Sequence, residues 1–293
     1  MKEITIISGK GGTGKTSVTA SFAFLAKNRV VVDADVDAAN LFLTLPHKTI
    51  HQESFIGGRI AKIDPAICTE CGECRERCQF DAISADFIVD PIACEGCKVC
   101  VHYCPVDAIL FEQQTCGERF LSETDNGPMV HAKLGIAQEN SGMLVSLLRQ
   151  QAREIAKKEK IPLIIVDGPP GIGCPVIASI TNADAILIVT EPSMSGMHDM
   201  ERVKLLADQM RIPALLCINK ADLNQEKTDQ MKAFARTNNI IFAGEIPFDR
   251  EVTASMNAGK SLAEFSRGAA SQAVAEVWQN VLNHVNTTMD RLI

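Results

Sequence analysis

Short apolar runs alternate with segments of helical spacing along most of the chain. The apolar runs are rich in β-branched residues, and each predicts a buried strand: residues 3–8, 29–33, 161–167, 185–190, 214–219 and, more briefly, 240–243. Helical spacing of apolar positions predicts helices up to about residue 27 and at about 38–43, 141–158, 196–210, 249–258 and 269–290. This alternation indicates βαβ units. The predicted fold class is therefore α/β, with a parallel sheet.

The alternation lapses between residues 60 and 115, where eight of the eleven cysteines lie. Within this stretch, residues 74–83 (Cys-Arg-Glu-Arg-Cys-Gln-Phe-Asp-Ala-Ile) resemble residues 100–109 (Cys-Val-His-Tyr-Cys-Pro-Val-Asp-Ala-Ile). Such a repeat indicates two equal halves related by a pseudo-twofold axis. We therefore expect residues 60–115 to form a small inserted α+β domain, and residues 1–59 and 116–293 to form one discontinuous domain around it.

The cysteines follow one pattern twice. The runs are Cys68-x₂-Cys71-x₂-Cys74-x₃-Cys78 and Cys94-x₂-Cys97-x₂-Cys100-x₃-Cys104, the second followed by Pro105. This is the spacing of a bacterial two-cluster ferredoxin, in which the fourth cysteine of each run ligates the other cluster. It predicts two [4Fe–4S] clusters, one on Cys68, Cys71, Cys74 and Cys104 and one on Cys94, Cys97, Cys100 and Cys78. Gln79 replaces the proline that usually follows the fourth cysteine, so the local turn is expected to differ.

Charge is concentrated in the same stretch. The chain has a net charge of −7, which argues against a nucleic-acid surface. Residues 64–107 hold nine acidic and three basic side chains, a net charge of −6. This excess suits docking on a basic redox partner. Because the chain opens directly on a strand and shows no apolar stretch of roughly 18 residues, we expect a cytoplasmic protein without a membrane partner.

A glycine-rich loop joins the first predicted strand to the first helix. It reads Gly9-Lys10-Gly11-Gly12-Thr13-Gly14-Lys15-Thr16. Glycines let consecutive backbone N–H groups face phosphate oxygens, and the following helix N-terminus favours anions. Lys15 is predicted to contact the outer phosphates, and Thr16 to offer its hydroxyl to Mg²⁺. The predicted nucleotide contacts are Gly11, Gly12, Thr13, Gly14, Lys15, Thr16 and Ser17. A chance glycine-rich turn is the alternative, which the flanking strand and helix disfavour.

Lys10 adds a resemblance to a known family. A lysine inside the loop resembles the deviant phosphate loop of the MinD/ParA/Mrp and nitrogenase iron-protein family. In that family this lysine reaches the phosphates bound by the opposite subunit of a dimer. The resemblance implies a SIMIBI-type P-loop ATPase domain, an α/β fold with a doubly wound, mostly parallel sheet and helices on both faces. It also implies that the domain requires Mg²⁺ and forms a homodimer, or a heterodimer with a similar ATPase. A solvated loop lysine is the alternative.

Two aspartate segments resemble the switches of the same family. In Asp33-Ala34-Asp35-Val36-Asp37, Asp35 resembles the residue that orients the attacking water, because that water needs an acceptor in line with the γ-phosphate. Asp167, in Asp167-Gly168-Pro169-Pro170-Gly171, resembles the strand-end aspartate that holds Mg²⁺. A capping or turn role is the alternative for Asp167 and the preferred interpretation of Asp33 and Asp37. The catalytic candidates are thus Lys10, Lys15, Asp35 and Asp167.

Base recognition is predicted at the end of another strand. Asn219-Lys220-Ala221-Asp222 taken alone resembles the guanine-reading sequence of GTPases. The family implied by the phosphate loop mostly uses ATP, with an asparagine at this strand end touching adenine, so we expect ATP. The segment from Ile246 through Pro247 to Asp249 resembles the family's loop that closes over the base. Lys220 and Pro247 therefore join Asn219 as predicted contacts.

Three cysteines lie outside the two runs. Cys174 follows the second switch, where relatives hold a metal or cluster between subunits, although a small residue at a helix start is an equal alternative. Cys116 is a weaker candidate for such a site, with burial or a loop position favoured, and Cys217 is expected to lie in the core. For the lone His131 we expect packing or hydrogen bonding rather than metal ligation.

The resemblance implies ATP hydrolysis coupled to the clusters. We favour a maturation factor that assembles, carries or inserts an Fe–S or other metal cofactor into a client metalloprotein. The alternative is an ATP-gated reductase that delivers low-potential electrons to a redox partner. A membrane-positioning protein is disfavoured, because polar residues interrupt the apolar positions Val281, Leu282 and Val285 of the last helix.

Overall fold

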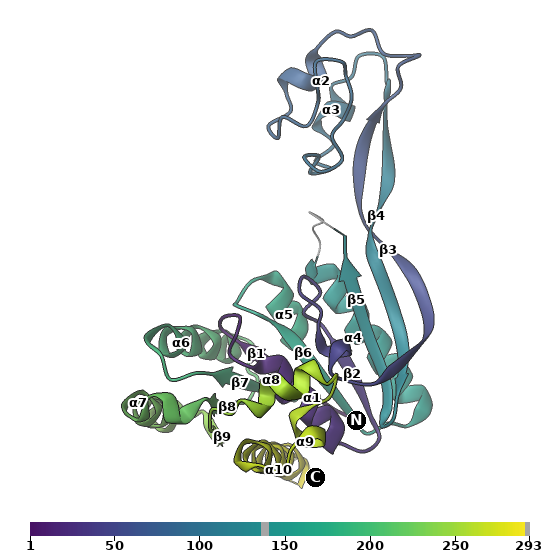
Figure 1. Cartoon of the computed structure of the whole chain (residues 1–293). Helices are drawn as coiled ribbons and strands as arrows, with labels where there is room; N and C mark the ends of the chain where they lie inside the picture. Colours follow the sequence, from purple (N-terminus) through teal and green to yellow (C-terminus); the bar gives the residue numbers. More distant parts are fainter. Residues whose placement is uncertain (136–140, 291–293) are drawn as a thin grey trace. The chain divides into compact units, whose positions relative to one another are not determined.

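The computed structural model describes residues 1–135 and 141–290, and these residues contain one large sheet flanked by helices (Figure 1). The sheet has nine strands in the order β3-β4-β5-β2-β6-β1-β7-β8-β9. β1 pairs in parallel with β6 and β7, and β2 pairs in parallel with β5 and β6. The predicted doubly wound, mostly parallel α/β fold is confirmed. In the described part of the chain no helix is long and apolar enough to cross a membrane.

The strands and helices have the following bounds. The strands are β1 Lys2–Ser8, β2 Arg29–Asp33, β3 His47–Ile63, β4 Ile109–Thr124, β5 Gly127–Leu134, β6 Leu163–Pro170, β7 Ala185–Thr190, β8 Ala214–Asn219 and β9 Ile241–Ile246. The α-helices are α1 Lys15–Leu25, α2 Glu73–Glu76, α3 Val99–His102, α4 Ser141–Glu159, α5 Cys174–Ile180, α6 Met194–Gln209, α7 Gln225–Thr237, α8 Glu251–Asn257, α9 Leu262–Phe265 and α10 Ala269–Asp290. Two short 3₁₀ helices are η1 Leu41–Leu43 and η2 Ala221–Leu223.

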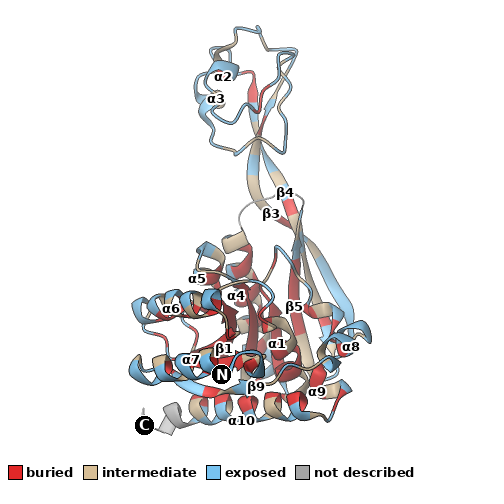
Figure 2. Ribbon diagram, turned by 60° about the vertical axis from the view of Figure 1, so that its left-hand side comes forward, coloured by how far each residue is buried: buried red, intermediate tan, exposed pale blue. Residues whose placement is uncertain are grey.

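The core lies on the two faces of the central strands, which are buried along nearly their whole length (Figure 2). Successive residues of a strand point to opposite faces. Thus Ile6 packs with α1 and α10 in one apolar cluster, and its neighbour Ile7 packs with α5 and α6 in another. Burial on both faces explains why these strands are continuous apolar runs that the sequence reveals.

Strands β3, β4 and β5 were not predicted. Most residues of β3 are exposed, and its polar and apolar residues are mixed, so no apolar run marks it. β4 is similarly mixed, and β5 begins with Gly127 and Pro128, which read as a turn. The tight turn at residues 125–126 joins β4 to its sheet neighbour β5, so these two strands run antiparallel.

The described residues form two compact units. Unit 1 comprises residues 1–52, 119–133 and 141–290, and unit 2 comprises residues 53–118 with 134–135; residues 136–140 lie outside the described part. β3 and β4 pass from one unit to the other. The domain limits expected from the sequence, residues 60 and 115, fall inside these two strands, each of which belongs in part to both units.

Unit 2 repeats its own backbone. The short helices α2 and α3 occupy equivalent places in the two halves. Equivalent residues share a left-handed backbone, with φ of 55° and 59° at Glu70 and Gly96, 86° and 67° at Gly72 and Lys98, and 49° and 53° at Asp81 and Asp107. The internal repeat of the sequence is therefore also a repeat of conformation, although most of these residues rarely adopt positive φ.

Candidate functional site

The phosphate loop lies between β1 and α1, at the carboxyl ends of the central strands. Gly12 and Gly14 have φ of +82° and +88°, which side chains rarely tolerate. A Cβ atom at Gly11 or Gly12 would meet no other protein atom within 4 Å, so the backbone there faces open space. Among the described residues, the buried Thr13 hydroxyl has no hydrogen-bond partner. An open backbone and an orphaned hydroxyl fit phosphate oxygens.

Lys15 lies at the centre of a buried polar cluster. Its ammonium lies 3.0 Å from Asp167 Oδ1 and 3.4 Å from Asp35 Oδ2. The Thr16 hydroxyl donates to Asp167 Oδ2 at 2.8 Å, and the Thr19 hydroxyl donates to Asp167 Oδ1 at 2.8 Å. The structure thus brings Lys15, Thr16, Asp35 and Asp167 together; Thr19 was not predicted, although it lies one helical turn after Lys15.

Electrostatics in this cluster favour a cation. Burial lowers the pKa of Lys15, but Asp167 and Asp35 outweigh it, so the pKa is raised overall. Burial and the nearby Asp167 raise the pKa of Asp33 to about 8, and burial also raises the pKa of Asp35. Three carboxyl groups thus face one ammonium, and bound Mg²⁺ would relieve the excess negative charge. The Thr16 hydroxyl and the Asp167 carboxylate are the oxygen ligands that Mg²⁺ prefers.

Asp33 stabilises the segment that follows β2. It is fully buried and lies beside Asp167 in the sheet. Its carboxylate accepts hydrogen bonds from the backbone N–H groups of Leu41, at 3.0 Å, and Asp35, at 3.3 Å. This is the turn role preferred for Asp33, whereas Asp37 is exposed. Asp33 therefore fixes the path on which Asp35 is presented.

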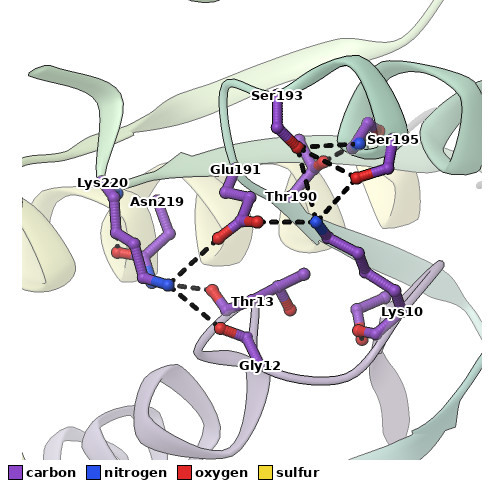
Figure 3. Close-up of polar contacts among 11 residues, drawn as sticks. Lys10, Gly12, Thr13, Thr190, Glu191, Ser193, Ser195, Asn219 and Lys220 are labelled. Atoms are coloured by element: carbon purple, nitrogen blue, oxygen red, sulfur yellow. Dashed lines mark hydrogen bonds and ion pairs between the residues drawn. The ribbon is translucent and has the colours of Figure 1, made fainter. Parts of the chain in front are cut away.

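Lys10 lies in a second polar cluster, across the phosphate loop (Figure 3). Its ammonium contacts Glu191 Oε1 at 2.6 Å and donates to Ser195 Oγ at 2.8 Å. The other oxygen of Glu191 lies 3.0 Å from Lys220, whose ammonium also donates to the carbonyl of Gly12 at 3.1 Å. Burial would raise the pKa of Glu191, but the hydrogen bonds from Lys10 and Lys220 lower it. Glu191 thus bridges the two lysines.

No motif predicted Glu191 or Ser195, since neither belongs to a recognised loop. One signal was available, because Glu191 directly follows β7, which ends at Thr190. The carboxyl ends of parallel strands meet at one edge of the sheet, where ligands bind. Polar residues at such an end are therefore candidates even without a motif.

The predicted base-binding segments also meet. Asn219 Nδ2 donates to the carbonyl of Thr13 at 2.8 Å, and a Cβ atom at Gly14 would lie 2.2 Å from that nitrogen. Asn219 therefore braces the phosphate loop in this structure. Asp222 Oδ1 accepts from the Phe248 N–H at 2.6 Å, which ties the segment containing Pro247 to the end of β8. Ser17, on α1, lies 3.8 Å from the sulfur of Met256.

Unit 2 contains two cavities, each lined by four cysteines. Cys68, Cys71, Cys74 and Cys104 line one cavity, and Cys78, Cys94, Cys97 and Cys100 line the other. These are the same two sets of four that the spacing predicts. Backbone N–H groups point at two of the sulfurs, from Glu70 to Cys68 at 3.4 Å and from Ala108 to Cys104 at 3.2 Å. Hydrogen bonds to sulfur are typical of cluster sites.

The donor set fits multi-iron clusters. Apolar side chains such as Phe87 and Ile109 wall one cavity, and Phe80 and Phe111 wall the other. Burial raises the pKa of Cys100 to about 11 and also raises that of Cys74, so iron binding would be needed to ionise these thiols. In the described part of the chain, no group of three or more His, Cys, Asp or Glu side chains is arranged to hold a single metal ion. In a [4Fe–4S] cluster each thiolate binds a different iron, so the four cysteine sulfurs lie further apart than the ligands of a single metal ion.

The remaining candidates are dispersed. Cys174 is exposed at the first position of α5, where Gly142 packs against it. Cys116 and Cys217 are buried, and burial raises the pKa of Cys217 to about 12, as expected for a core residue. His131 is buried, and its Nε2 lies 3.0 Å from Ser122 Oγ. Its ring stacks on Phe42 and Phe120, which matches the predicted packing role.

Comparison with known proteins identifies the family. Residues 4–262 match the CobQ/CobB/MinD/ParA nucleotide binding domain. The chain belongs to this family. Members of the MinD/ParA group are P-loop ATPases, so the predicted relationship is confirmed, and ATPase activity is supported at the level of the family.

Individual relatives of this MinD/ParA-type chain span nearly its whole length. An uncharacterized protein of Methanocaldococcus jannaschii is 34% identical over 95% of the chain and 96% of its own length. An iron-sulfur cluster carrier protein of Pyrococcus abyssi is 22% identical over 96% of the chain and 85% of its own length. The septum site-determining protein MinD of Pyrococcus horikoshii, solved with Mg-ADP, superposes with a TM-score of 0.59 at 18% identity, over 96% of this chain and 95% of that one. This last likeness shows the fold.

Proposed function

We propose that this protein is an ATP-hydrolysing iron–sulfur protein, in which a nucleotide-dependent dimer drives the assembly, carriage or insertion of an Fe–S or other metal cofactor. One observation carries the proposal. A chain with the phosphate loop, Lys10 and both switch aspartates also provides two complete sets of four cysteines. The likeness to an iron-sulfur cluster carrier supports it. We further propose that the cysteine-rich unit is a ferredoxin-like domain and that the protein acts in the cytoplasm.

The nucleotide step follows from the side chains around the loop. In this proposal Lys15 binds the outer phosphates of ATP, while Thr16 and Asp167 hold Mg²⁺, which offsets the charge of the phosphates. Asp35 accepts a hydrogen bond from the attacking water and aligns it with the γ-phosphate. Asn219, Lys220 and Pro247 surround the adenosine. The P. horikoshii protein solved with Mg-ADP supports the choice of an adenine nucleotide.

Dimerisation supplies the remaining charge. We propose that Lys10 of each protomer reaches the phosphates bound by the other, so hydrolysis requires two chains. Within one chain Lys10 contacts Glu191, and that contact has to break before Lys10 can cross to a partner. The partner is a second copy or a similar ATPase. An additional metal or cluster held between the two Cys174 thiols would be the cargo, released after hydrolysis.

An ATP-gated reductase is the second candidate function. All four ligands of each proposed cluster come from one chain, and hydrogen bonds to Cys68 and Cys104 support them. A cluster with all four ligands from one chain is a permanently bound group. Such a group suits electron transfer better than transfer of the cluster itself to a client. In this reading, ATP hydrolysis times the delivery of electrons to a redox partner.

One experiment separates the two candidates. The protein is purified anaerobically, and ATP-dependent transfer of iron and sulfide to an apo-ferredoxin acceptor is measured beside ATP-dependent reduction of an added acceptor dye. Wild type is compared with Cys174→Ser, and Cys116→Ser is the control outside both cavities. Loss of transfer in Cys174→Ser alone, with reduction intact, supports the carrier. Undiminished metal content in Cys174→Ser, with electron flow strictly dependent on ATP hydrolysis, would favour the reductase.

A further inference from the structure

An apolar groove runs along one cluster cavity of unit 2. Its volume is about 330 Å³, and it is lined by β3 residues 60–63, by Pro65, Cys68 and Glu70, and by residues 86–89 and Pro91. Cys68 lines this groove and also the cavity that it shares with three other cysteines. A molecule seated in the groove therefore touches a proposed ligand of that cluster.

The groove presents a large apolar side chain to solvent. Ile88 lines the groove and is 67% exposed. Ile67 and Ile92 directly adjoin lining residues in the sequence, and they are 49% and 64% exposed. An exposed aliphatic side chain at a groove is apolar surface that a partner can cover. Burial of Ile88 against a partner would remove this apolar surface from water.

Ile88 is held in place by a strained hairpin. Its N–H donates to Ser84 Oγ at 3.1 Å, and its carbonyl accepts from the Ser84 N–H at 3.0 Å. The preceding Phe87 has φ of +57°, a strained conformation for an aromatic residue, and packs among the apolar and cysteine side chains of unit 2. Anchoring Phe87 inward thus projects Ile88 outward. Backbone strain maintained by surrounding contacts is characteristic of functional positions.

The charged residues at the rim of the groove indicate the charge of the partner. Glu70 and Asp86 line the groove and are exposed. The one lysine of the lining, Lys62, lies 3.4 Å from Glu112, which offsets its charge. The rim is therefore acidic, as is the surrounding stretch 64–107 with its net charge of −6. A complementary surface would place lysine or arginine around an apolar projection.

We propose that this groove is the docking surface for a basic protein partner, and that the cluster on Cys68, Cys71, Cys74 and Cys104 is the one that faces it. This inference rests on the proposed function, since it requires resident clusters. The partner inserts an apolar side chain beside Ile88, while its cations pair with Glu70 and Asp86. A cluster bound by these four cysteines would supply one-electron donation to an oxidised centre of the partner, and Cys68 is the proposed ligand that lines the groove.

The test uses cytochrome c, a basic haem protein, as the probe. Its affinity for the anaerobically purified protein is measured by calorimetry without reductant, and haem reduction by the dithionite-reduced, desalted protein is followed by stopped flow. The variants are Glu70→Lys/Asp86→Lys and Ile88→Gln. Glu95→Lys/Asp81→Lys is the matched control, because it makes the same change of charge away from the groove.

The groove variants should lower both affinity and haem-reduction rate by about tenfold, and the control should change them by about twofold or less. Reduction of methyl viologen, a small acceptor that needs no docking surface, should stay unchanged. Equal losses in the two charge variants, or full affinity in Ile88→Gln, would overturn the docking site. Iron content and EPR spectra are recorded for every variant. Absence of iron from wild type would refute the cluster assignment itself, whereas iron-loaded protein that binds the probe without preference for the groove would refute only the docking proposal.

Discussion

The ammonium of Lys10 lies 2.6 Å from the carboxylate of Glu191 in the same chain. Glu191 also holds Lys220, so a single carboxylate bridges two cations on either side of the phosphate loop. Lys10 is the residue that the family resemblance assigns to the phosphates of a partner subunit. The contact with Glu191 therefore competes with the contact that we propose for the dimer.

Removing this competition should favour the dimer. Glu191→Gln keeps the size of the side chain and removes its charge, so Lys10 is freed at little structural cost. We expect ATP-dependent dimerisation at lower protein concentration, measured by sedimentation velocity, and faster phosphate release at subsaturating protein. Slower release with weaker dimerisation would show that Glu191 acts in the dimer instead. Glu201→Gln, at a partly exposed position of α6, provides a control for charge alone.

Substitution of the two lysines of the phosphate loop should have different effects on nucleotide binding and hydrolysis. Lys10→Ala is expected to abolish hydrolysis while nucleotide binding by the monomer stays measurable, because its target lies in the other chain. Lys15→Ala should weaken binding itself, because it removes the buried ammonium from the phosphates of its own chain. Equilibrium binding of a fluorescent ATP analogue and phosphate release distinguish these outcomes. Equal turnover in Lys10→Ala and wild type would contradict the deviant-loop interpretation.

Substitutions of Asp35 and Asp33 should also have different effects, one on hydrolysis and the other on stability. Asp35→Asn is expected to slow hydrolysis and let an ATP-bound dimer accumulate, with little change in stability. Asp33→Ala should lower the free energy of unfolding by about 1–3 kcal/mol, because it removes the acceptor of the N–H groups of Leu41 and Asp35. Phosphate release and urea denaturation measure the two effects. The reverse pattern would exchange the proposed roles.

Cluster content tests whether the fourth cysteine of each run binds the cluster of the other run. Wild type should contain about eight irons per chain, in two [4Fe–4S] clusters. Cys78→Ser should damage the same cluster as Cys97→Ser, although Cys78 belongs to the first run, because these residues line one cavity. Each variant should lose the spin coupling between reduced clusters in low-temperature EPR spectra. Damage to different clusters would refute the grouping, and recovery of zinc alone would refute the cluster assignment.

Buried His131 should make stability depend on pH. Burial lowers its pKa to about 4 from 6.5, so folding favours the neutral ring. Between these values the unfolded chain binds more protons, and stability is expected to fall by up to about 3 kcal/mol as pH drops from 6.5 to 4. Urea denaturation at several pH values, followed by fluorescence of the buried Trp278, measures this. His131→Phe should flatten the dependence over this range; an unchanged curve would mean that other groups cause it.

Particular residues show what the sequence could and could not reveal. The central strands are recognisable because burial on both faces demands unbroken apolar runs, as in residues 185–190. β3 escaped prediction because its mostly exposed residues carry no such run. Glu191 escaped because it belongs to no motif and acquires its partners only when the ends of β1, β7 and β8 meet.

Local patterns along the chain were enough to predict much of the chemistry of this protein. Cysteine spacing, glycine positions and strand periodicity all concern residues near one another along the chain, so they predicted the phosphate loop, the two cysteine runs and the parallel sheet. Tertiary structure decided which distant groups meet. The contacts of Lys10 with Glu191, of Lys15 with Asp35 and Asp167, and the groove beside Cys68 join segments separated along the chain. Their proximity depends on strand order and on a hairpin within unit 2, which no local pattern encodes.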